Sequence, residues 1–414
     1  MSDLKPPRGT SDLLPDAYRR HKYVQDTARS IAELYGFKEI STPIFESSEV
    51  FSRTLGETSD VVTKEMYTFE DKKGRNLSLR PEGTAGVARA FISHMRAETL
   101  PLKLFYQGPM FRYERAQKGR QRQFHQFGVE LLGAAEPLAD IEVISLAAHV
   151  LEDLGLAEKV TLHINTLGDT DSRQTYRKIL VAYLKAHEGE LSKDSQMRLD
   201  RNPMRILDSK DQVDRAIISD APKIIDHMNN FSADFFFAVK DGLETAGVKY
   251  EVNPTLVRGL DYYCHTAFEF VTETLGAQGA VIAGGRYDGL IETMGGPATP
   301  GIGWAAGIER LSLMVNNLPL EALSIALIPI GLQADSRALE IAGRLRRAGF
   351  TIDLGYSGSL KKCLKRADKS GASAAVILGE EELAKGVATI RNMKTGVQME
   401  VDLSSLEGAL IQFN

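Results

Sequence analysis

Two β-like runs that flank a basic loop, between Leu104 and Glu130, constrain the fold of this chain more than any other feature. The first run is apolar at Leu104, Phe105 and Tyr106, and the second alternates apolar and polar residues as it approaches Glu130. This pattern predicts an antiparallel hairpin whose strands lie on a sheet floor and whose loop projects toward a polyanion. A surface hairpin with a solvated basic tip is the alternative. Arginines beside acids and glutamines argue against it, because that mixture binds a phosphate and a polar small molecule together.

The composition excludes several classes of protein. A chain of 414 residues that is 43% hydrophobic and 25% charged can bury a sizeable core, and we expect two or three domains. Its net charge of −5 excludes a global basic field, so a nucleic acid would have to bind at local patches. The only cysteines, Cys264 and Cys363, exclude a disulfide framework and a cysteine-based zinc cluster. Without a bilayer-spanning apolar run or a signal peptide, we expect a cytoplasmic protein that does not bind membranes.

The N-terminal half predicts helices and strands on either side of the hairpin. Gly36 is a natural stop for the first helix, and Pro43 suits a strand at an edge or an interface. The pentapeptide RPEGT (80–84) follows a strand, and its glycine permits close approach of the backbone to a ligand. An ordinary turn before a helix is the alternative for this pentapeptide. The predicted elements are helix 16–35, strand 37–44, hairpin 65–80, helix 85–94, helix 141–154 and strand 161–167.

The middle of the chain changes character twice. Residues 169–249 are helix-forming and charged, and they interrupt two β-rich segments. We interpret them as an inserted helical domain that contacts the acceptor end of a nucleic acid, with a purely structural insertion as an equal alternative. A strand is predicted over 257–271, which begins VRGLDYY, and AGGRYDG follows at 283–289. Two adjacent tyrosines at the start of a strand are more often packing than chemistry.

No standard nucleotide-binding loop is present. GIGWAAG (301–307) lacks the spacing of a dinucleotide fingerprint and no βαβ unit surrounds it, so we interpret it as close packing of a strand into a following helix. A Walker-type phosphate loop is absent from the sequence, so arginines on a sheet would have to hold any ATP. No metal site built by the protein itself is predicted.

The last ninety or so residues predict a separate α/β domain with a parallel sheet, closed by a hairpin around Gly396. A helix over 359–371 places Leu360, Cys363, Leu364 and Ala367 on one face and lysines and an arginine on the other. The basic face is either merely solvated or a surface for RNA.

Several of these segments resemble signatures of the histidyl-tRNA synthetase family, within the class II aminoacyl-tRNA synthetases. The hairpin 104–130 resembles motif 2 of that class, and the GIERL segment at 307–311 resembles motif 3. RPEGT, RGLDYY and GGRYDG resemble sequences of the histidyl family itself, and the helix 16–35 with its strand and Pro43 resembles motif 1, a dimer interface. The resemblance covers nearly the whole chain.

This resemblance implies a fold and an activity. The fold would be an α+β catalytic domain on an antiparallel sheet (1–320), with a helical insertion at about 169–249 and a C-terminal α/β anticodon-binding domain (322–414). The activity would be ATP-dependent attachment of L-histidine to tRNA(His) by a homodimer, through a histidyl-adenylate, with Mg²⁺ bridging the phosphates of ATP. AMP and diphosphate would be released.

The resemblance also implies roles for individual residues. Arg112 and Arg258 would be catalytic, on either side of the α-phosphate. Arg112 and Arg310 would bind ATP, the latter at the γ-phosphate. The histidine-binding residues would be Glu82, Gly83, Thr84, Gln126, Glu130, Arg258, Tyr262, Tyr263 and Tyr287.

Residues on two separate segments would bind tRNA by the same resemblance. Ala116, which stands between two of them, is a proline in many relatives, and this difference affects the rigidity of the loop. The implied tRNA-binding residues are Arg115, Gln117, Arg120, Lys361 and Lys365.

Three alternatives compete with this activity. A non-catalytic paralogue that regulates histidine biosynthesis would lack the C-terminal domain and lose the arginines of motif 2, and both are present here. An RNA-binding protein without catalysis would have no reason to retain Glu130 together with both tyrosine signatures. Another class II synthetase would lack RGLDYY and GGRYDG. The enzyme is the favoured prediction.

Overall fold

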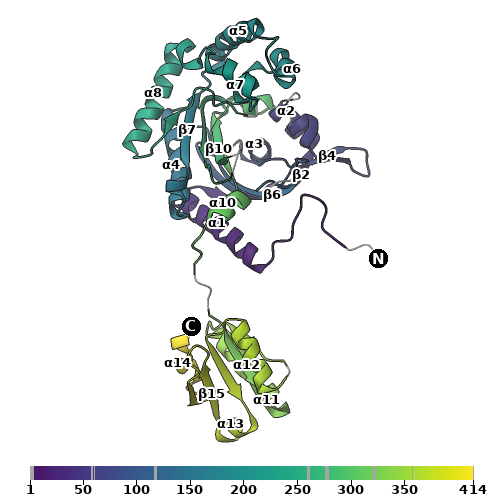
Figure 1. Cartoon of the computed structure of the whole chain (residues 1–414), viewed down its shortest axis with the longest axis vertical. Helices are drawn as coiled ribbons and strands as arrows, with labels where there is room; N and C mark the ends of the chain where they lie inside the picture. Colours follow the sequence, from purple (N-terminus) through teal and green to yellow (C-terminus); the bar gives the residue numbers. More distant parts are fainter. Residues whose placement is uncertain are drawn as a thin grey trace. The chain divides into compact units, whose positions relative to one another are not determined.

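The computed structural model of the chain divides into two compact units, Met1–Leu318 and Pro319–Asn414 (Figure 1). Each unit has a buried core of its own. The residues that the structure describes are 4–56, 59, 61–115, 119–258, 262–275, 279–319, 323–356 and 358–413.

An eight-stranded sheet forms the centre of the first unit, in the order β1-β5-β6-β11-β10-β9-β7-β8. The outermost pairs, β1 with β5 and β7 with β8, are parallel, and all other neighbours are antiparallel. The hairpin predicted around the basic loop is β5 with β6, so the prediction of an antiparallel catalytic sheet is confirmed. The strands are β1 Lys38–Glu39, β5 Leu102–Phe111, β6 Gln123–Leu132, β7 Thr161–Thr166, β8 Glu251–Val252, β9 Cys264–Val271, β10 Ala280–Arg286 and β11 Gly301–Gly307.

Successive side chains of these strands point to opposite faces of the sheet, and each face has its own helices. Phe105 and Phe127 pack on one face, in a core with α1, α4, α8 and α10. Leu104 and Tyr106 pack on the other face, where α3 lies within the curve of the sheet (Figure 1). Glu130 is three residues after Phe127 on β6, so its side chain points to the opposite face of the sheet, where α3 lies. The helices are α1 Pro15–Leu34, α3 Thr84–Ala90, α4 Pro137–Asp153, α8 Asn230–Thr245 and α10 Ile308–Met314.

A small antiparallel sheet, in the order β2-β4-β3, leads the chain into α3. Its β3 and β4 are the predicted hairpin 65–80. The predicted strand 37–44 is wrong in length, because only Lys38 and Glu39 pair in a ladder. The carbonyl of Thr42 instead accepts from the guanidinium of Arg80 (3.0 Å), and the next residue, Pro43, has no N–H to donate. The elements here are β2 Phe45–Ser47, α2 Ser48–Leu55, β3 Thr68–Glu70, β4 Asn76–Leu79 and a π-helical turn at Phe91–Met95 that follows α3.

The segment predicted as a helical insertion forms α5, α6 and α7 before α8 returns to the sheet (Figure 1). The buried carboxylate of Asp214 holds this region together, since it accepts from the hydroxyls of Ser192 (2.7 Å), Ser195 (2.6 Å) and Ser209 (2.6 Å). The polar sequence of the insertion is therefore partly structural, and its contact with a nucleic acid stays a prediction. The helices are α5 Thr170–Ala186, α6 Lys193–Arg201 and α7 Gln212–Ser219.

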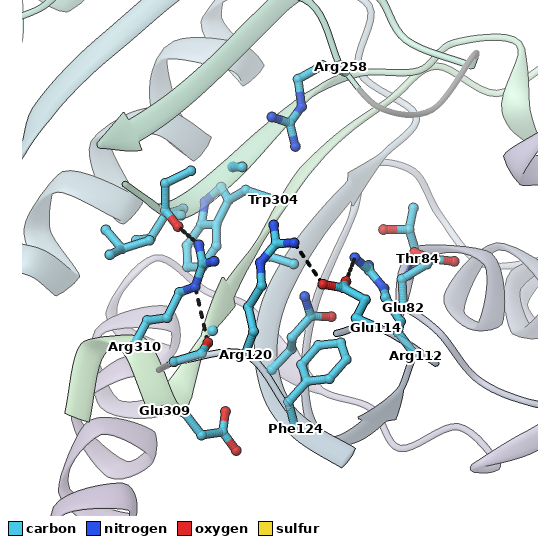
Figure 2. A pocket seen from close by; sticks show the side chains of 18 of the residues that line it. Glu82, Thr84, Arg112, Glu114, Arg120, Phe124, Arg258, Trp304, Glu309 and Arg310 are labelled. Atoms are coloured by element: carbon cyan, nitrogen blue, oxygen red, sulfur yellow. Dashed lines mark hydrogen bonds and ion pairs between the residues drawn. The ribbon is translucent and has the colours of Figure 1, made fainter. Parts of the chain in front are cut away.

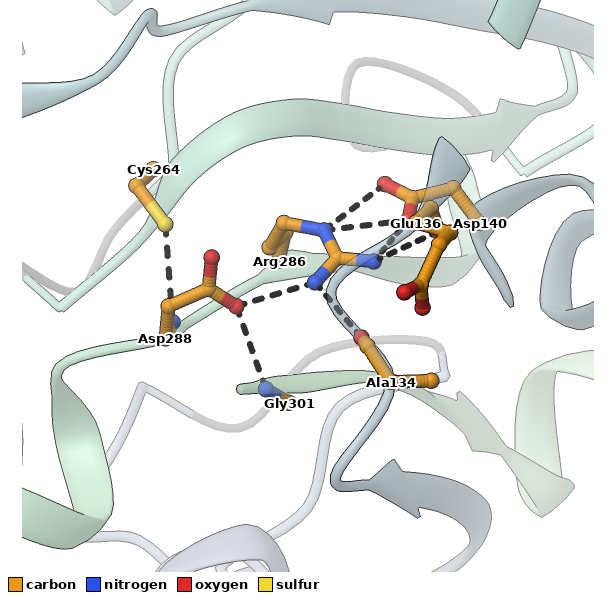
Figure 3. A network of polar contacts seen from close by, with 7 residues as sticks. All are labelled: Ala134, Glu136, Asp140, Cys264, Arg286, Asp288 and Gly301. Carbon is orange, nitrogen blue, oxygen red and sulfur yellow. Dashed lines mark hydrogen bonds and ion pairs between the residues drawn. The ribbon is translucent and has the colours of Figure 1, made fainter. Parts of the chain in front are cut away.

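A buried ion pair at one end of the sheet explains the arginine of the GGRYDG signature. The guanidinium of Arg286 on β10 donates to Asp140 on α4, to Asp288 (3.0 Å) and to the carbonyl of Ala134 (3.0 Å) (Figure 3). Arg286 and Asp140 have fully buried side chains. Burial alone would lower the pKa of Arg286, but its two carboxylate partners raise it overall. The pair therefore fixes α4 to the sheet rather than contacting a substrate.

We expect Asp140→Ala to lower the free energy of unfolding of the first unit by about 3–5 kcal/mol, because it leaves the charge of Arg286 buried without its main partner. Urea denaturation followed by fluorescence tests this, since the single tryptophan, Trp304, is buried in the sheet of this unit. The exposed pair of Arg53 and Glu49 is the control, and Glu49→Ala should cost less than about 1 kcal/mol. Similar losses for both variants would contradict a structural role for the buried pair.

The second unit is a five-stranded sheet in the order β13-β12-β14-β15-β16. The first three strands are parallel and the last two antiparallel, so the predicted parallel sheet is in fact mixed. On α12, Cys363 and Ala367 are buried and the lysines are exposed as predicted, but Leu360 is 38% exposed. The elements are β12 Ile325–Pro329, α11 Leu332–Arg347, β13 Ile352–Leu354, α12 Leu360–Lys369, β14 Ala374–Leu378, α13 Glu380–Lys385, β15 Val387–Asn392, β16 Gln398–Asp402 and α14 Leu406–Leu410.

Across the described residues of both units, no helix is both long and apolar enough to cross a membrane.

Candidate active site

A cavity of about 250 Å³ lies on the α3-facing side of the large sheet. Its floor comes from β6, β10 and β11, and its walls come from the start of α3, the loop after β5 and the start of α10. Figure 2 shows the guanidinium groups of Arg112, Arg120, Arg258 and Arg310 around one space. The hairpin, RPEGT, RGLDYY and GIERL segments, far apart in the sequence, therefore contribute side chains to one site.

Two cations of the hairpin segment, Arg112 and Arg120, share one carboxylate. Glu114 accepts from Arg120 (2.7 Å), and its other oxygen lies 3.8 Å from the guanidinium of Arg112. Arg112 also donates through Nε to the carbonyl of Pro81 (2.8 Å), and its guanidinium lies 5.5 Å from the ring centre of Phe124. These contacts fix the direction in which Arg112 points.

Arg310 at the start of α10 completes the cluster of positive charge. Its guanidinium donates to the carbonyls of Ala280 and Gly119. Burial lowers the pKa of Arg310, and the neighbouring cation of Arg120 lowers it further. Guanidinium groups held this close together favour an anion between them, since a phosphate would offset their mutual repulsion.

Arg258 approaches the cavity from the opposite side. Its guanidinium lies 3.6 Å from Glu269 on β9 and 5.6 Å from the ring centre of Tyr263. Its Nε is buried and has no hydrogen-bond partner among the described residues. The group is thus oriented but not saturated, which leaves donors for a ligand. Asp261, three residues further along the chain, would be another partner for Arg258 in a purely structural role, and it lies outside the described residues.

A buried carboxylate lies under the other end of the cavity. Glu130 on β6 is 1% exposed, and its two oxygens accept from the hydroxyls of Thr84 (2.7 Å) and Tyr287. Thr84 lines the cavity, so its hydroxyl connects Glu130 to the lining. Burial raises the pKa of Glu130 to about 8, and the two hydroxyl donors offset only part of that effect. A perturbed carboxyl group beneath a cavity is typical of a functional site.

Glu82 has a local structural partner as well. Its carboxylate accepts from the backbone N–H groups of Thr84 (2.7 Å) and Ala85 (2.9 Å), so it caps the first turn of α3. Burial raises the pKa of Glu82, and these N–H groups offset part of the rise. Both the ordinary turn and a ligand contact are compatible with this geometry, because Glu82 also lines the cavity.

The glycines of GIGWAAG make room for buried side chains of the site. A Cβ on Gly303 would overlap Oε2 of Glu130, and one on Gly301 would overlap the ring of Tyr287. The sequence predicts close packing of this segment against the following helix, but these glycines pack against site residues instead. Gly83 has the same function, since a Cβ there would overlap the ring of Tyr106.

The structure brings most of the predicted site residues together. Three predicted histidine-binding residues are not among those that line the cavity: Glu130, Gly83 and Tyr287. Arg115 is exposed on the loop, and Gln117 lies outside the described residues. Lys361 and Lys365 are exposed on the second unit. The predicted residues that line the cavity are Glu82, Thr84, Arg112, Arg120, Gln126, Arg258, Tyr262, Tyr263 and Arg310.

The lining residues that sequence reasoning missed include Phe124, Glu114 and Glu309. Phe124 is two residues before Gln126, so strand alternation already placed it on the same face. Glu114 is two residues after Arg112, and Glu309 directly precedes Arg310. An aromatic ring beside arginines is a stacking surface for a flat ligand such as a nucleobase.

Comparison with known proteins identifies the family. The family model described as histidyl-tRNA synthetase matches residues 9–311. The chain belongs to the histidyl-tRNA synthetase family. A second model, described as an anticodon binding domain, matches residues 324–412. The resemblance stated from the sequence motifs is thus confirmed.

Relatives of known sequence and structure support this membership over the full length. A histidine--tRNA ligase of Rhodospirillum rubrum is 57% identical over 414 residues and covers 100% of both chains. One from Gluconobacter oxydans is 53% identical over 98% of both chains. The crystal structure of a Staphylococcus aureus histidyl-tRNA synthetase has a TM-score of 0.83 and 38% identity, and covers 98% of this chain and 99% of its own. The fold predicted for the class II family is therefore confirmed.

Proposed function

We propose that this protein is a histidine–tRNA ligase that activates L-histidine with ATP and transfers it to tRNA(His). The observation that carries the proposal is one cavity in which a cluster of arginines adjoins a polar pocket with a buried carboxylate. Such a site can hold a polyphosphate and a small polar amino acid side by side. The high identity to histidine--tRNA ligases over both units supports the same activity.

In the first step, the carboxylate of histidine attacks the α-phosphorus of ATP, and the bond to the diphosphate breaks. Negative charge spreads over the phosphoryl oxygens, and fixed cations stabilise it. Arg112 and Arg258 approach from opposite sides of the cavity (Figure 2) and would contact the α-phosphate. Arg310 would hold the γ-phosphate, and Mg²⁺ would arrive with ATP and bridge its phosphates.

The amino acid would be recognised by side chains around α3. A neutral imidazole presents one N–H donor and one acceptor, so each nitrogen needs a partner. Glu130 would accept from one nitrogen, and Tyr263 would lie near the other, with Tyr287 beside the ring. Gly83 would act through packing, since it leaves room for the ring of Tyr106 behind the ligand, and Tyr262 would contact the ligand from the RGLDYY segment.

The α-amino group would be held by three further side chains. The Oε1 atom of Gln126 is buried without a hydrogen-bond partner among the described residues, so it is free to accept from an ammonium group. Glu82 and Thr84 would supply the other contacts, in addition to their structural bonds near α3. This arrangement would place the carboxylate of histidine toward the arginines.

In the second step, a terminal ribose hydroxyl of tRNA attacks the adenylate and releases AMP. Arg115, Gln117 and Arg120 on the motif 2 loop would contact the acceptor end. Lys361 and Lys365 on α12 would contact the anticodon arm. Their exposure supports this role, because phosphate contacts by cations contribute much of the affinity for RNA.

We also propose a homodimer that works in the cytoplasm. Exposed apolar side chains near the motif 1 segment support a partner there, since Leu34 is 75%, Ile44 is 43% and Phe45 is 49% exposed. Analytical ultracentrifugation tests the proposal, and a monomer at micromolar concentration would contradict it.

Histidine-dependent exchange of diphosphate into ATP tests the proposed activity. We expect exchange with histidine alone among the amino acids, and charging of tRNA(His) in a second assay. A non-catalytic regulator or an RNA-binding protein would show no exchange. Absence of exchange by folded, dimeric protein would therefore overturn the proposal.

A chain truncated after Leu318 should retain adenylate formation, provided that it stays folded, because every proposed catalytic residue precedes that point. It should charge tRNA at least about 100-fold less efficiently, since the basic face of α12 is lost and several phosphate contacts with it. A matched full-length control carries Lys361→Ala and Lys365→Ala, which should weaken tRNA binding without changing diphosphate exchange. Unchanged tRNA affinity after truncation would contradict the assignment of the second unit.

A further inference from the structure

Two histidines and a glutamate form a cluster beside the cavity that has no part in the reaction proposed above. His21 comes from α1, His125 from β6 and Glu309 from the start of α10. One nitrogen or oxygen of each lies within 4.8 Å of those of the other two. The Nδ1 atom of His125 lies 2.8 Å from Oε1 of Glu309, and Nε2 of His21 lies 4.0 Å from that same oxygen.

His21 is the unusual member of the cluster. It is 3% exposed, and neither ring nitrogen has a partner at good hydrogen-bond geometry among the described residues, although the side chain of Gln25 lies nearby. It lies edge-on to His125, with ring centres 4.6 Å apart. Buried polar atoms in proteins are nearly always satisfied by a partner, so each exception requires an explanation. A packing role alone does not explain His21, because an apolar side chain would fill the same space without leaving two nitrogens unsatisfied.

We propose that His21, His125 and Glu309 form a binding site for a divalent transition-metal ion of the zinc class. Two imidazoles and a carboxylate suit zinc and its neighbours, whereas magnesium and calcium prefer oxygen ligands alone. Ligand atoms at zinc distances of about 2.0–2.2 Å in a tetrahedral arrangement lie about 3.3 Å from one another. The two separations from Glu309, 2.8 and 4.0 Å, bracket that value, and the ligand atoms of the two histidines lie within 4.8 Å of each other, so rotations of the side chains would complete the site. Water would occupy the fourth position.

Neighbouring groups orient these residues for metal binding. The backbone N–H of His125 donates to both oxygens of Glu309 (2.9 and 3.0 Å), and this orients the carboxylate as a supporting hydrogen bond orients a metal ligand. Burial lowers the pKa of His21, and His125 lowers it further, while Glu309 and the side chain of Gln25 oppose the shift only in part. A neutral imidazole is the form that binds metals, and burial of the ring favours that form.

An ion here would join three parts of the catalytic unit. It would tie α1 to the hairpin strand β6 and to the first turn of α10. Glu309 lines the cavity and directly precedes Arg310, so the metal would fix the part of α10 from which Arg310 reaches the site. The site is therefore structural, and it is separate from the Mg²⁺ that accompanies ATP.

Metal binding to the full-length chain tests the proposal without any assay of activity. The protein is stripped with a chelator, dialysed, and titrated with Co²⁺ and Zn²⁺ in the absence of ATP. We expect one ion per chain, a visible Co²⁺ absorption band of a low-coordinate site, and a melting temperature that rises by several degrees at about 100-fold excess over Kd. Mg²⁺ at the same concentration should leave the melting temperature unchanged.

Two variants and a control separate this site from adventitious binding. His21→Leu and His125→Ala should each weaken Co²⁺ binding by at least about 100-fold, since each removes a ligand. His163→Ala is the matched control, because His163 also lies beside a carboxylate, Glu251 (3.4 Å), but near the far edge of the sheet. It should bind Co²⁺ as the unchanged chain does.

Stability without metal provides an independent readout. In the stripped protein, His21→Leu should melt at or above the temperature of the unchanged chain, because it removes two unsatisfied buried nitrogens. With zinc present the order should reverse. Failure of the unchanged chain to bind one equivalent, or equal binding by His21→Leu, would overturn the proposal.

Discussion

Replacing Glu130 with alanine is expected to lower kcat/KM for histidine by about 10⁴-fold or more, while the affinity for ATP changes by less than about threefold. In a site built to hydrogen-bond a polar group of the substrate, kcat/KM falls by about this factor when one partner of the hydrogen bond is missing. The other partner is then buried without a hydrogen bond. The carboxylate of Glu130 is 1% exposed and accepts from the hydroxyl of Thr84, on the side of the cavity that we propose for the amino acid. Diphosphate exchange at varied histidine and ATP concentrations measures both effects.

Glu130→Gln is the matched variant, because it preserves volume and one acceptor. It should retain more activity than alanine, since the amide oxygen can still accept from an imidazole N–H. Equal losses of histidine and ATP affinity in Glu130→Ala would show that Glu130 does not bind the imidazole. A circular dichroism spectrum and a melting curve exclude general unfolding as the cause.

The same carboxylate should make stability depend on pH in the ligand-free protein. Burial raises its pKa from 4.5 to about 8 on folding, so the folded state favours the protonated form. The stabilisation from this proton is complete below about pH 4.5 and is lost as pH rises to about 8. We therefore expect the melting temperature of Glu130→Gln, relative to the unchanged chain, to increase between pH 5 and 8.5. A constant difference over that range would show that Glu130 titrates normally.

The alternation of residues along one strand was enough to place Gln126 and Glu130 on the same face of the sheet. Gln126 and Glu130 are four residues apart, and side chains at even spacing share a face of a sheet. The basic loop before them indicated a polyanion at the strand ends. Both inferences depend only on neighbouring residues of the chain, and for that reason the sequence alone supports them.

Contacts between distant segments were not accessible in the same way. The partner of Arg286 is Asp140, which is 146 positions away, so the signature arginine gave no sign of its buried ion pair. Likewise, His125 and Glu309 are 184 positions apart, and His21 lies on a helix that the periodicity placed correctly without giving its neighbours. Periodicity gives the face on which a side chain lies, but packing between elements decides what it contacts.

The length of the strand after α1 shows the other limit. Apolar and β-branched residues predicted pairing up to residue 44, yet the ladder ends at Glu39. The guanidinium of Arg80 replaces a neighbouring strand as the partner of the Thr42 carbonyl. A side chain from another segment thus ended a strand that local propensity would have continued.

Arg258→Ala is expected to slow adenylate formation by about 10²–10³-fold, or ~2.7–4 kcal/mol, with modest changes in KM for histidine and ATP. The guanidinium lies opposite Arg112 across the cavity, and its Nε has no partner within the described residues (Figure 2). If the guanidinium contacts the α-phosphate, its stabilising effect grows as charge develops there. Its removal therefore raises the activation barrier more than it weakens binding of the ground state. Single-turnover adenylation kinetics measure this rate directly.

The competing explanation is that Arg258 only braces β9 through Glu269, which lies 3.6 Å away. That explanation predicts a lower melting temperature and a near-normal rate, and it predicts the same result for Glu269→Gln. The catalytic role predicts a slow Arg258→Ala beside a near-normal Glu269→Gln, and only a partial recovery of the rate in Arg258→Lys. Lysine restores the charge but not the planar set of donors that a guanidinium presents. A normal single-turnover rate in folded Arg258→Ala would refute the catalytic role.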